Sequence, residues 1–450
     1  MRVTDFAVIG GGWAGIAACV ELAQAGHRPV LFESASTLGG RARATRMTVA
    51  GVEVELDNGQ HLMLGAYRDC LRLCAVVGGD SAAAMRRTRL DLRSTRGLRL
   101  RAWRLPAPLH LLGGLLAARG LSFSERIAIL RMMVGLRADG WRAPPGETVR
   151  ELLRRLRQPE SLQKALWDPL SVAALNTPSD AACAQTFARV LQDSLGARAS
   201  ASDFVLPVHT LSQLLPEPAD AWLRRREATL SLRTTVRALS ADGDRWTIDS
   251  TRDSWQATRV VLAVPPFAAA RLLAAVEGLS PAAGALVEAL GRYAYDSIAT
   301  VYLSWLEASA PALPPWVMLD ECAQDRGWGQ WLFDRGTQCG LRIAAVVVSA
   351  RGRLAEVAPA ELAAGIARQV SDQLGIAMPI DARTVVEKRA TFRCTPDRPE
   401  LRPDAFAALA PPGSVLARLA LAGDYTVPHY PATLESAVRS GVQAARLLMR

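Results

Sequence analysis

The chain has 450 residues, half of them apolar, and a formal net charge of +10. It is long enough to bury a large core and to form two domains. No charge-free apolar run reaches about eighteen residues, which argues against a membrane-spanning helix, and the opening MRVTDFAVIGGG lacks the pattern of a secretory signal. Seven cysteines without a CxxC pair exclude a disulfide framework and a structural zinc site, so no metal is expected.

The basic charge is almost entirely arginine, since Lys164 and Lys388 are the only lysines. A GC-rich coding bias and attraction to an anionic surface both account for this composition. Nucleic acid is not expected as a partner, because the arginines are dispersed and no recognition motif accompanies them.

The segment DFAVIGGGWAGIAACVELAQAGHRPVLFES predicts a strand at residues 6–9, a helix at 16–25 and a second strand at 29–32. Between the first strand and the helix, three glycines lie at GxGxxG spacing: Gly10, Gly12 and Gly15. The first permits a tight turn, the second lets the backbone approach a pyrophosphate, and the third allows close helix–strand packing. The helix N-terminus then offers free N–H groups to the phosphates.

Glu33 follows Gly10 by twenty-three residues, at the end of the second predicted strand. An acid at this position accepts hydrogen bonds from the ribose hydroxyls, which favours an adenine dinucleotide without a 2′-phosphate. NAD and FAD both satisfy this pattern.

The next segment, STLGGRARATR, resembles the extended flavin fingerprint of the amine oxidase and phytoene desaturase superfamily. The resemblance implies FAD, with Gly39, Gly40 and Arg41 near its diphosphate. An arginine suits this task because its guanidinium is permanently charged and forks toward phosphate oxygens.

The C-terminal stretch LARLALAGDYTVPHYPATLESAVRSGVQAARLL predicts a buried strand at 419–422 and an amphipathic helix at 433–448. Upstream, Asp242-Gly243 marks a hairpin, and a further strand at 259–264 stops at a pair of prolines. The resemblance implies contacts to the cofactor from Val236, Gly423, Asp424, Thr433 and Leu434.

The expected fold is α/β, with a Rossmann-type FAD-binding domain interleaved with an α+β substrate domain. The FAD domain is predicted to be discontinuous, over residues 1–85, 205–290 and 400–450. The substrate domain is predicted to comprise residues 86–204 and 291–399.

Within the superfamily, the sequence resembles the hydroxysqualene dehydroxylase family in the blocks DNGQHLMLGAY, LWDPLSVAALNT, EKRATF and GDYTVPHYPATLESAVRSG. The resemblance implies FAD-dependent reductive dehydroxylation of hydroxysqualene to squalene in hopanoid biosynthesis, by hydride transfer from flavin N5 to an allylic cation. It also implies a C30 isoprenoid substrate, an unidentified electron donor and neighbouring squalene-pathway enzymes. A carotenoid or phytoene-type desaturase, a flavin amine oxidase and a non-catalytic flavin-fold protein are the alternatives. Lys388 lacks the context of the lysine that amine oxidases place near the flavin, and is predicted to be structural or exposed.

A substrate of this kind resides in a bilayer. Residues 109–121 are almost wholly apolar, too short to span, and flanked by arginines and tryptophans, so a membrane-facing helix is predicted near 105–121. The protein is therefore expected in the cytoplasm, peripheral on the inner face of the cytoplasmic membrane.

A polar cluster, DNGQH, precedes an apolar run. The resemblance implies that Asp57, Asn58, Gly59 and Gln60 all belong to the cofactor-binding set. Asp57 and Gly59 are predicted to set the turn, and Asn58, Gln60 and His61 to line the flavin side of the cavity. His61 is also a catalytic candidate. The groups considered as proton donors to the leaving hydroxyl are His61, Asp168, Tyr425 and His429. Ser179 and Asp180 are predicted to cap the helix that follows, and Trp167 to pack in the core.

Overall fold

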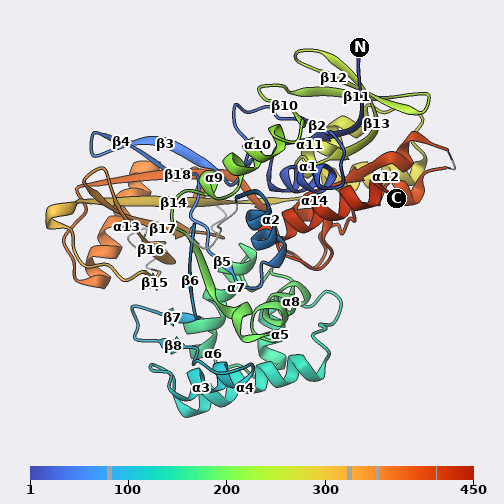
Figure 1. Ribbon diagram of the computed structural model, residues 1–450. Coiled ribbons are helices and arrows are strands. Elements are labelled where there is room, and N and C mark those ends of the chain that lie inside the picture. The colour runs from blue at the N-terminus through green and yellow to red at the C-terminus, as the bar shows by residue number, and fades with distance from the viewer. Residues whose placement is uncertain (79–83, 322–326, 351–353, 412) are drawn as a thin grey trace.

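Two sheets of different construction organise the computed structural model, which describes residues 1–78, 84–321, 327–350, 354–411 and 413–450 (Figure 1). The first sheet has the order β10-β2-β1-β13-β12-β11, and β19 also pairs with β13. Its strands are β1 (Arg2–Ile9), β2 (Val30–Phe32), β10 (Thr229–Ser231), β11 (Val236–Asp242), β12 (Arg245–Ser250), β13 (Ser254–Leu262) and β19 (Leu419–Leu421). β10, β2, β1, β13 and β19 run parallel, so their carboxyl ends meet at one edge.

Two helices from opposite ends of the chain cross beside this sheet: α1 (Trp13–Gln24) and α14 (Leu434–Leu448) (Figure 1). The crossing is close, since a Cβ on Gly441 of α14 would lie 2.0 Å from the Ala14 carbonyl oxygen of α1. A short run of small residues on α1 therefore brings the C-terminal helix, and the loop before it, next to the glycine loop after β1.

The second sheet is antiparallel in the order β15-β16-β17-β14-β18 and is covered by α13 (Pro359–Leu374). Its strands are β14 (Tyr295–Leu306), β15 (Trp316–Met318), β16 (Trp331–Gln338), β17 (Leu341–Val348) and β18 (Asp381–Phe392). The hairpin of β3 (Ala44–Val49) and β4 (Val52–Asp57) leaves the first sheet and reaches β18, so it links the two sheets.

The remaining elements include a helical region that forms the lower part of the molecule in Figure 1. Its helices are α3 (Leu109–Leu116), α4 (Phe123–Ala138), α5 (Val149–Arg155), α6 (Glu160–Leu162), α7 (Asp168–Leu175) and α8 (Ala184–Ser194). Short strands join it to the rest: β5 (Met63–Leu64), β6 (Met85–Thr88), β7 (Asp91–Arg93), β8 (Arg99–Arg101) and β9 (Phe204–Pro207). The other helices are α2 (Arg68–Gly78), α9 (Leu211–Leu214), α10 (Pro216–Arg224), α11 (Pro266–Ala274) and α12 (Pro281–Gly291).

The strand–helix–strand unit at the N-terminus, the hairpin at Asp242-Gly243 and the C-terminal helix are confirmed. The strands of the first sheet fall within residues 1–85, 205–290 and 400–450, and those of the second within 291–399. Assignment of these segments to a cofactor domain and a substrate domain stays a prediction.

One local prediction is confirmed only in part, and one is wrong. A helix does lie within 105–121, but it is α3 alone, because Arg119 forms a β-bridge with Arg99 and the chain turns there. That this helix faces a membrane stays a prediction. Ser179 and Asp180 do not cap α8, whose N-cap is Cys183. Their side chains instead bond to Asp168 and Arg150. Among the described helices, none is long and apolar enough to cross a membrane.

Candidate active site

A cavity of about 960 Å³ lies where the first sheet, the second sheet and the lower helices meet. At one end it is lined by the glycine loop after β1 and the loop before α14, and at the other by side chains of α3 and α4. The second part, here called the apolar arm, is lined by Leu90, Leu92, Leu112, Leu115, Ile129 and Met133. One continuous space therefore joins a backbone-rich end to a hydrocarbon-lined end.

The three glycines of the GxGxxG loop have different physical reasons to be glycine. Gly10 has φ +107°, and a Cβ there would lie 2.3 Å from the Ala263 carbonyl oxygen. A Cβ on Gly15 would lie 1.9 Å from the Gly10 carbonyl oxygen, so this glycine sets helix–strand packing and lies outside the cavity lining. Around Gly12, the nearest described protein atom to an added Cβ is the Gly40 Cα, at 3.9 Å. The protein's own packing thus leaves space beside Gly12, on the cavity wall.

The N-terminus of α1 adjoins this space. Gly12 is its N-cap, and no side chain of the described chain caps it. The first N–H groups of a helix have no partner within the helix, and the helix dipole makes this end positive. An open N–H cluster at a cavity wall is suited to bind phosphate oxygens.

Glu33 lines the same end of the cavity and is held in place by backbone donors. One carboxylate oxygen accepts from the Gly11 N–H at 2.7 Å, and the other accepts from the Ala35 N–H at 2.7 Å. The side chain is therefore positioned at the carboxyl end of β2, where the sequence pattern places a ribose acceptor.

Gly39 and Gly40 bring a second loop against the first. Both have positive φ, +117° and +59°, and a Cβ on Gly40 would lie 3.0 Å from the Gly12 Cα. This contact places the GG-R segment in the cavity wall beside the helix N-terminus.

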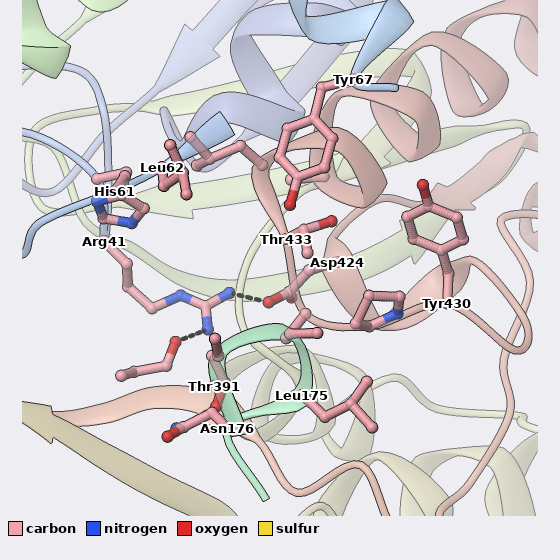
Figure 2. A pocket seen from close by; sticks show the side chains of 18 of the residues that line it. Arg41, His61, Leu62, Tyr67, Leu175, Asn176, Thr391, Asp424, Tyr430 and Thr433 are labelled. Atoms are coloured by element: carbon pink, nitrogen blue, oxygen red, sulfur yellow. Dashed lines mark hydrogen bonds and ion pairs between the residues drawn. The ribbon is translucent and has the colours of Figure 1, made fainter. Parts of the chain in front are cut away.

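Arg41 and Asp424 both line the cavity and form an ion pair with each other (Figure 2). One guanidinium nitrogen lies 2.8 Å from an Asp424 carboxylate oxygen, and the other donates to the Ala390 carbonyl at 2.8 Å. Through these two contacts Arg41 joins three segments that are distant in sequence: its own loop, the end of β18 and the loop after β19. Two guanidinium nitrogens of Arg41 are bound to acceptors of the protein itself. Arg41 therefore organises this wall of the cavity even without a bound cofactor.

The polar cluster DNGQH lies between the two sheets, and its first residue does not line the cavity. The buried Asp57 carboxylate accepts from the Leu211 N–H at 2.7 Å and lies 3.7 Å from Arg335. Burial raises the pKa of Asp57 to about 6, and the Leu211 N–H and Arg335 oppose this rise. Asp57 therefore holds the turn from the side that faces away from the cavity. The prediction that it belongs to the cofactor-binding residues is corrected, because its side chain is buried against Leu211 and Arg335.

Asn58, Gly59, Gln60 and His61 do line the cavity. The Asn58 amide is occupied by the chain itself, since its oxygen accepts from the Arg43 N–H and its nitrogen donates to the Arg41 carbonyl. Gln60 is different, because its buried side-chain oxygen has no hydrogen-bond partner among the described residues. It is an available acceptor in the cavity wall.

His61 is held by its own turn, with Nδ1 2.7 Å from the Gly59 carbonyl oxygen. A carbonyl accepts only, so Nδ1 carries the proton. Burial lowers the pKa of His61, which keeps the ring neutral near pH 7. Nε2 is then an acceptor and not an acid. Of the other acid candidates, Tyr425 lines the cavity, but Asp168 is paired with Arg150 and His429 with Glu400, both outside the lining.

Val236, Gly423, Thr433 and Leu434 also lie on the cavity wall, and Thr433 is the N-cap of α14. Lys388 is exposed on β18 and is not part of the lining. Trp167 is buried, donates to the Gln158 side chain and borders the cavity.

The site predicted from the sequence does not include several polar residues that the fold brings to the cavity from separate elements: Tyr67, Asn176, Glu387, Thr391 and Tyr430 (four of them labelled in Figure 2). Asn176 has φ +46° as the left-handed C-cap of α7, and its amide bonds to Thr391 and to the Ala350 N–H. The local sequence signal that could have pointed to Asn176 is an asparagine at the end of a predicted helix, where a left-handed C-cap is common.

The parallel sheet, the glycine loop open at Gly12 and the positioned Glu33 define a protein that binds an adenine dinucleotide. The orphaned oxygen of Gln60 and the space beside the α1 N-terminus fit FAD. The model of the family described as flavin containing amine oxidoreductase matches residues 13–449, and the chain belongs to this family. It is an FAD-dependent oxidoreductase.

Two relatives named hydroxysqualene dehydroxylase align over nearly their whole length. The Rhodopseudomonas palustris protein is 27% identical, over 98% of this chain and 97% of its own. The Sinorhizobium fredii protein is also 27% identical, with the same coverage. Among solved structures, a putative protoporphyrinogen oxidase from Exiguobacterium sp. has a TM-score of 0.66 at 16% identity, over 100% of this chain and 99% of its own, which shows the fold.

Proposed function

We propose that this enzyme removes the hydroxyl group of hydroxysqualene reductively and releases squalene. The names of its full-length relatives support this substrate. The observation that carries the proposal is the cavity, which joins the dinucleotide end to the apolar arm in one space. A long hydrocarbon needs such a lining, because each buried CH₂ is stabilised by about 0.8 kcal/mol on leaving water.

The reaction requires that a C–O bond break and a C–H bond form. The hydroxyl group leaves as water after it gains a proton, and an allylic cation remains on the hydrocarbon. Reduced FAD, when bound, supplies the hydride from N5. The carbon is reduced by two electrons, so an electron donor must supply two electrons for each turnover. Its identity, and association with other enzymes of squalene synthesis, belong to the proposal.

The chain's own residues hold and orient the reactants. Gly12, Glu33 and the N-termini of α1 and α14 hold the dinucleotide, and Gln60 offers an acceptor to it. His61 Nε2 accepts a hydrogen bond inside the cavity and so orients a hydroxyl or a flavin N–H. The apolar arm excludes water, which would otherwise capture the cation.

Amine oxidation is less well supported. A lysine close to the flavin is expected there, and Lys388 is exposed outside the lining. A desaturase has the same cofactor and lipid class but the opposite direction of electron flow, so product analysis must decide between them.

The test is a parallel substrate assay. Purified holoenzyme, reduced under anaerobic conditions, is incubated with hydroxysqualene, and oxidised holoenzyme is incubated with phytoene and with putrescine. Squalene from the first reaction alone is expected. Desaturated products from phytoene, or hydrogen peroxide with putrescine, together with no squalene, would refute the proposal. Flavin absorbance verifies in each case that the cofactor is bound.

A further inference from the structure

Exposed apolar side chains gather on α3, on α4 and on the segment just before α3. Figure 1 shows these two helices at the lower edge of the molecule. Eight of the sixteen exposed large apolar side chains among the described residues lie between positions 103 and 134. They are Trp103, Leu105, Leu109, Leu116, Phe123, Ile127, Leu130 and Val134, here called the apolar face. Monomeric proteins rarely expose so concentrated a group without a partner.

The apolar face follows helical geometry on α4. Phe123, Ile127, Leu130 and Val134 recur at intervals of four, three and four residues, so they form one stripe. The two ends of the stripe are strongly exposed, Phe123 at 76% and Val134 at 67%. The opposite side of α4 is buried in the core. Because α4 is apolar on both sides, one apolar side is left in contact with water, which is unfavourable. This argues that the exposed side meets an apolar environment outside the protein.

The charges around the apolar face are almost all positive. Residues 103–138 contain five arginines and one acidic residue, Glu125. That glutamate is engaged at the start of α4, where it bonds to Ser122 and Ser161. Within the described chain, none of the exposed arginines of this segment forms an ion pair: Arg104, Arg119, Arg131 and Arg137. Free guanidinium groups beside exposed tryptophan and leucine match an anionic lipid surface.

The cavity reaches this same surface. Leu130 is 37% exposed and also lines the cavity, and the exposed Pro108 does so as well. Leu112 and Met133, both only partly buried, lie beside them in the lining. The wall between the apolar arm and the apolar face is thus about one side chain thick.

We propose that the apolar face docks on an anionic bilayer and that hydrocarbon substrates enter the apolar arm directly from it, between α3 and α4. The entry part of this inference rests on the proposed function, because it needs a substrate that resides in the bilayer. The docking part stands on the exposure and charge alone. The Trp103 ring at the edge of the face occupies the position that aromatic side chains take at a membrane interface.

The test compares two triple variants of the holoenzyme in vesicle flotation. L116E/F123E/V134E places charge on the apolar face, and L306E/M378E/I380E places the same charge on equally apolar, exposed positions at the second sheet. Vesicles contain phosphatidylcholine with or without phosphatidylglycerol. The parent and the second variant are expected to bind the anionic vesicles at least about tenfold better than the neutral ones, and the first variant to lose that binding.

Equal binding by all three proteins, or equal loss in both variants, would overturn the docking proposal. Self-association removed by L116E/F123E/V134E, without vesicle binding by the parent, would assign the face to a second copy of the chain and overturn it too.

Activity then separates entry from function. Hydroxysqualene is supplied to each protein in detergent micelles and in anionic vesicles. The L116E/F123E/V134E variant is expected to be slowed only with vesicles. Equal rates from vesicles for parent and variant would overturn the entry route. If the parent makes no squalene from either source, the proposed function fails, and flotation still decides the docking.

Discussion

Substitution of Gly12 by alanine separates what the fold requires from what the cofactor requires. The backbone at Gly12 has φ −72° and ψ −179°, which alanine adopts freely. Its Cβ would meet no described protein atom closer than 3.9 Å. Loss of glycine at an N-cap costs roughly 0.5–1 kcal/mol, and the reduced entropy of the unfolded chain returns roughly 0.4–1 kcal/mol. The free energy of unfolding of the apoprotein is therefore expected to change little.

FAD binding by G12A is expected to fall sharply. The methyl group occupies the space through which the pyrophosphate approaches the N–H groups of α1. Loss of two hydrogen bonds to a charged group, at roughly 1.5–3 kcal/mol each, raises Kd by about a hundredfold to ten-thousandfold. The assay is titration of apoprotein with FAD, followed by flavin fluorescence, beside urea unfolding of the apoprotein.

The matched variant is G15A. Its Cβ would lie 1.9 Å from a backbone oxygen, so the helix or the strand must shift, and the apoprotein is expected to lose more than about 2 kcal/mol of stability. Retention of parental FAD affinity by G12A would refute the assignment of the glycine loop. A loss of stability in G12A as large as in G15A would contradict the claim that the protein leaves this space open.

Three further outcomes are expected. E33A should bind FAD at least about tenfold more weakly, since a charge-assisted bond to the ribose is lost, whereas stoichiometric FAD in the purified variant would contradict the ribose role. Burial raises the folded-state pKa of Asp57 to about 6, above its unfolded value, so the parent loses stability as its carboxyl ionises between about pH 4 and pH 6. D57N has no carboxyl at this position and should not lose stability in this way. The difference in free energy of unfolding, D57N minus parent, should therefore rise by up to about 3 kcal/mol between pH 4 and pH 6. A difference that does not change with pH would contradict the raised pKa of Asp57. Because burial lowers the pKa of His61, its ring should become protonated on NMR titration only at a lower pH than a free histidine does. An imidazolium signal at neutral pH would exclude the acceptor role of Nε2.

The parts of the site that are local in sequence could be predicted. The glycine spacing, Glu33 and the capped start of α14 each express a local rule about a turn, a strand end or a helix end. For the same reason, the parallel strands around β1 followed from short apolar runs with glycine or proline at their ends.

Contacts made by the pairing of distant strands could not be predicted. Arg41 meets Ala390 and Asp424 only because β18 and the loop after β19 come together. Asp57 shows the same limit, since the N–H that it binds belongs to Leu211, 154 positions away. Its polar neighbours suggested a cavity residue, and burial turned it away from the cavity.

For the apolar run at 109–121, the pattern predicted a helix correctly but not its length. The run carries exposed apolar side chains at Leu109 and Leu116, but α3 ends at Leu116 and much of the run is buried. The exposed stripe of α4 could not be told apart from its buried side in the sequence, because both sides carry apolar residues and the pattern does not say which of them faces solvent.

The proposed function requires that reduced FAD in this cavity transfer hydride to the carbon that loses the hydroxyl. Anaerobic holoenzyme with fully reduced flavin, mixed with hydroxysqualene in micelles, tests it in a single turnover. We expect the absorbance of oxidised flavin to reappear, with one squalene formed for each flavin oxidised. Squalene without flavin oxidation, or flavin that stays reduced while hydroxysqualene is recovered unchanged, would contradict it.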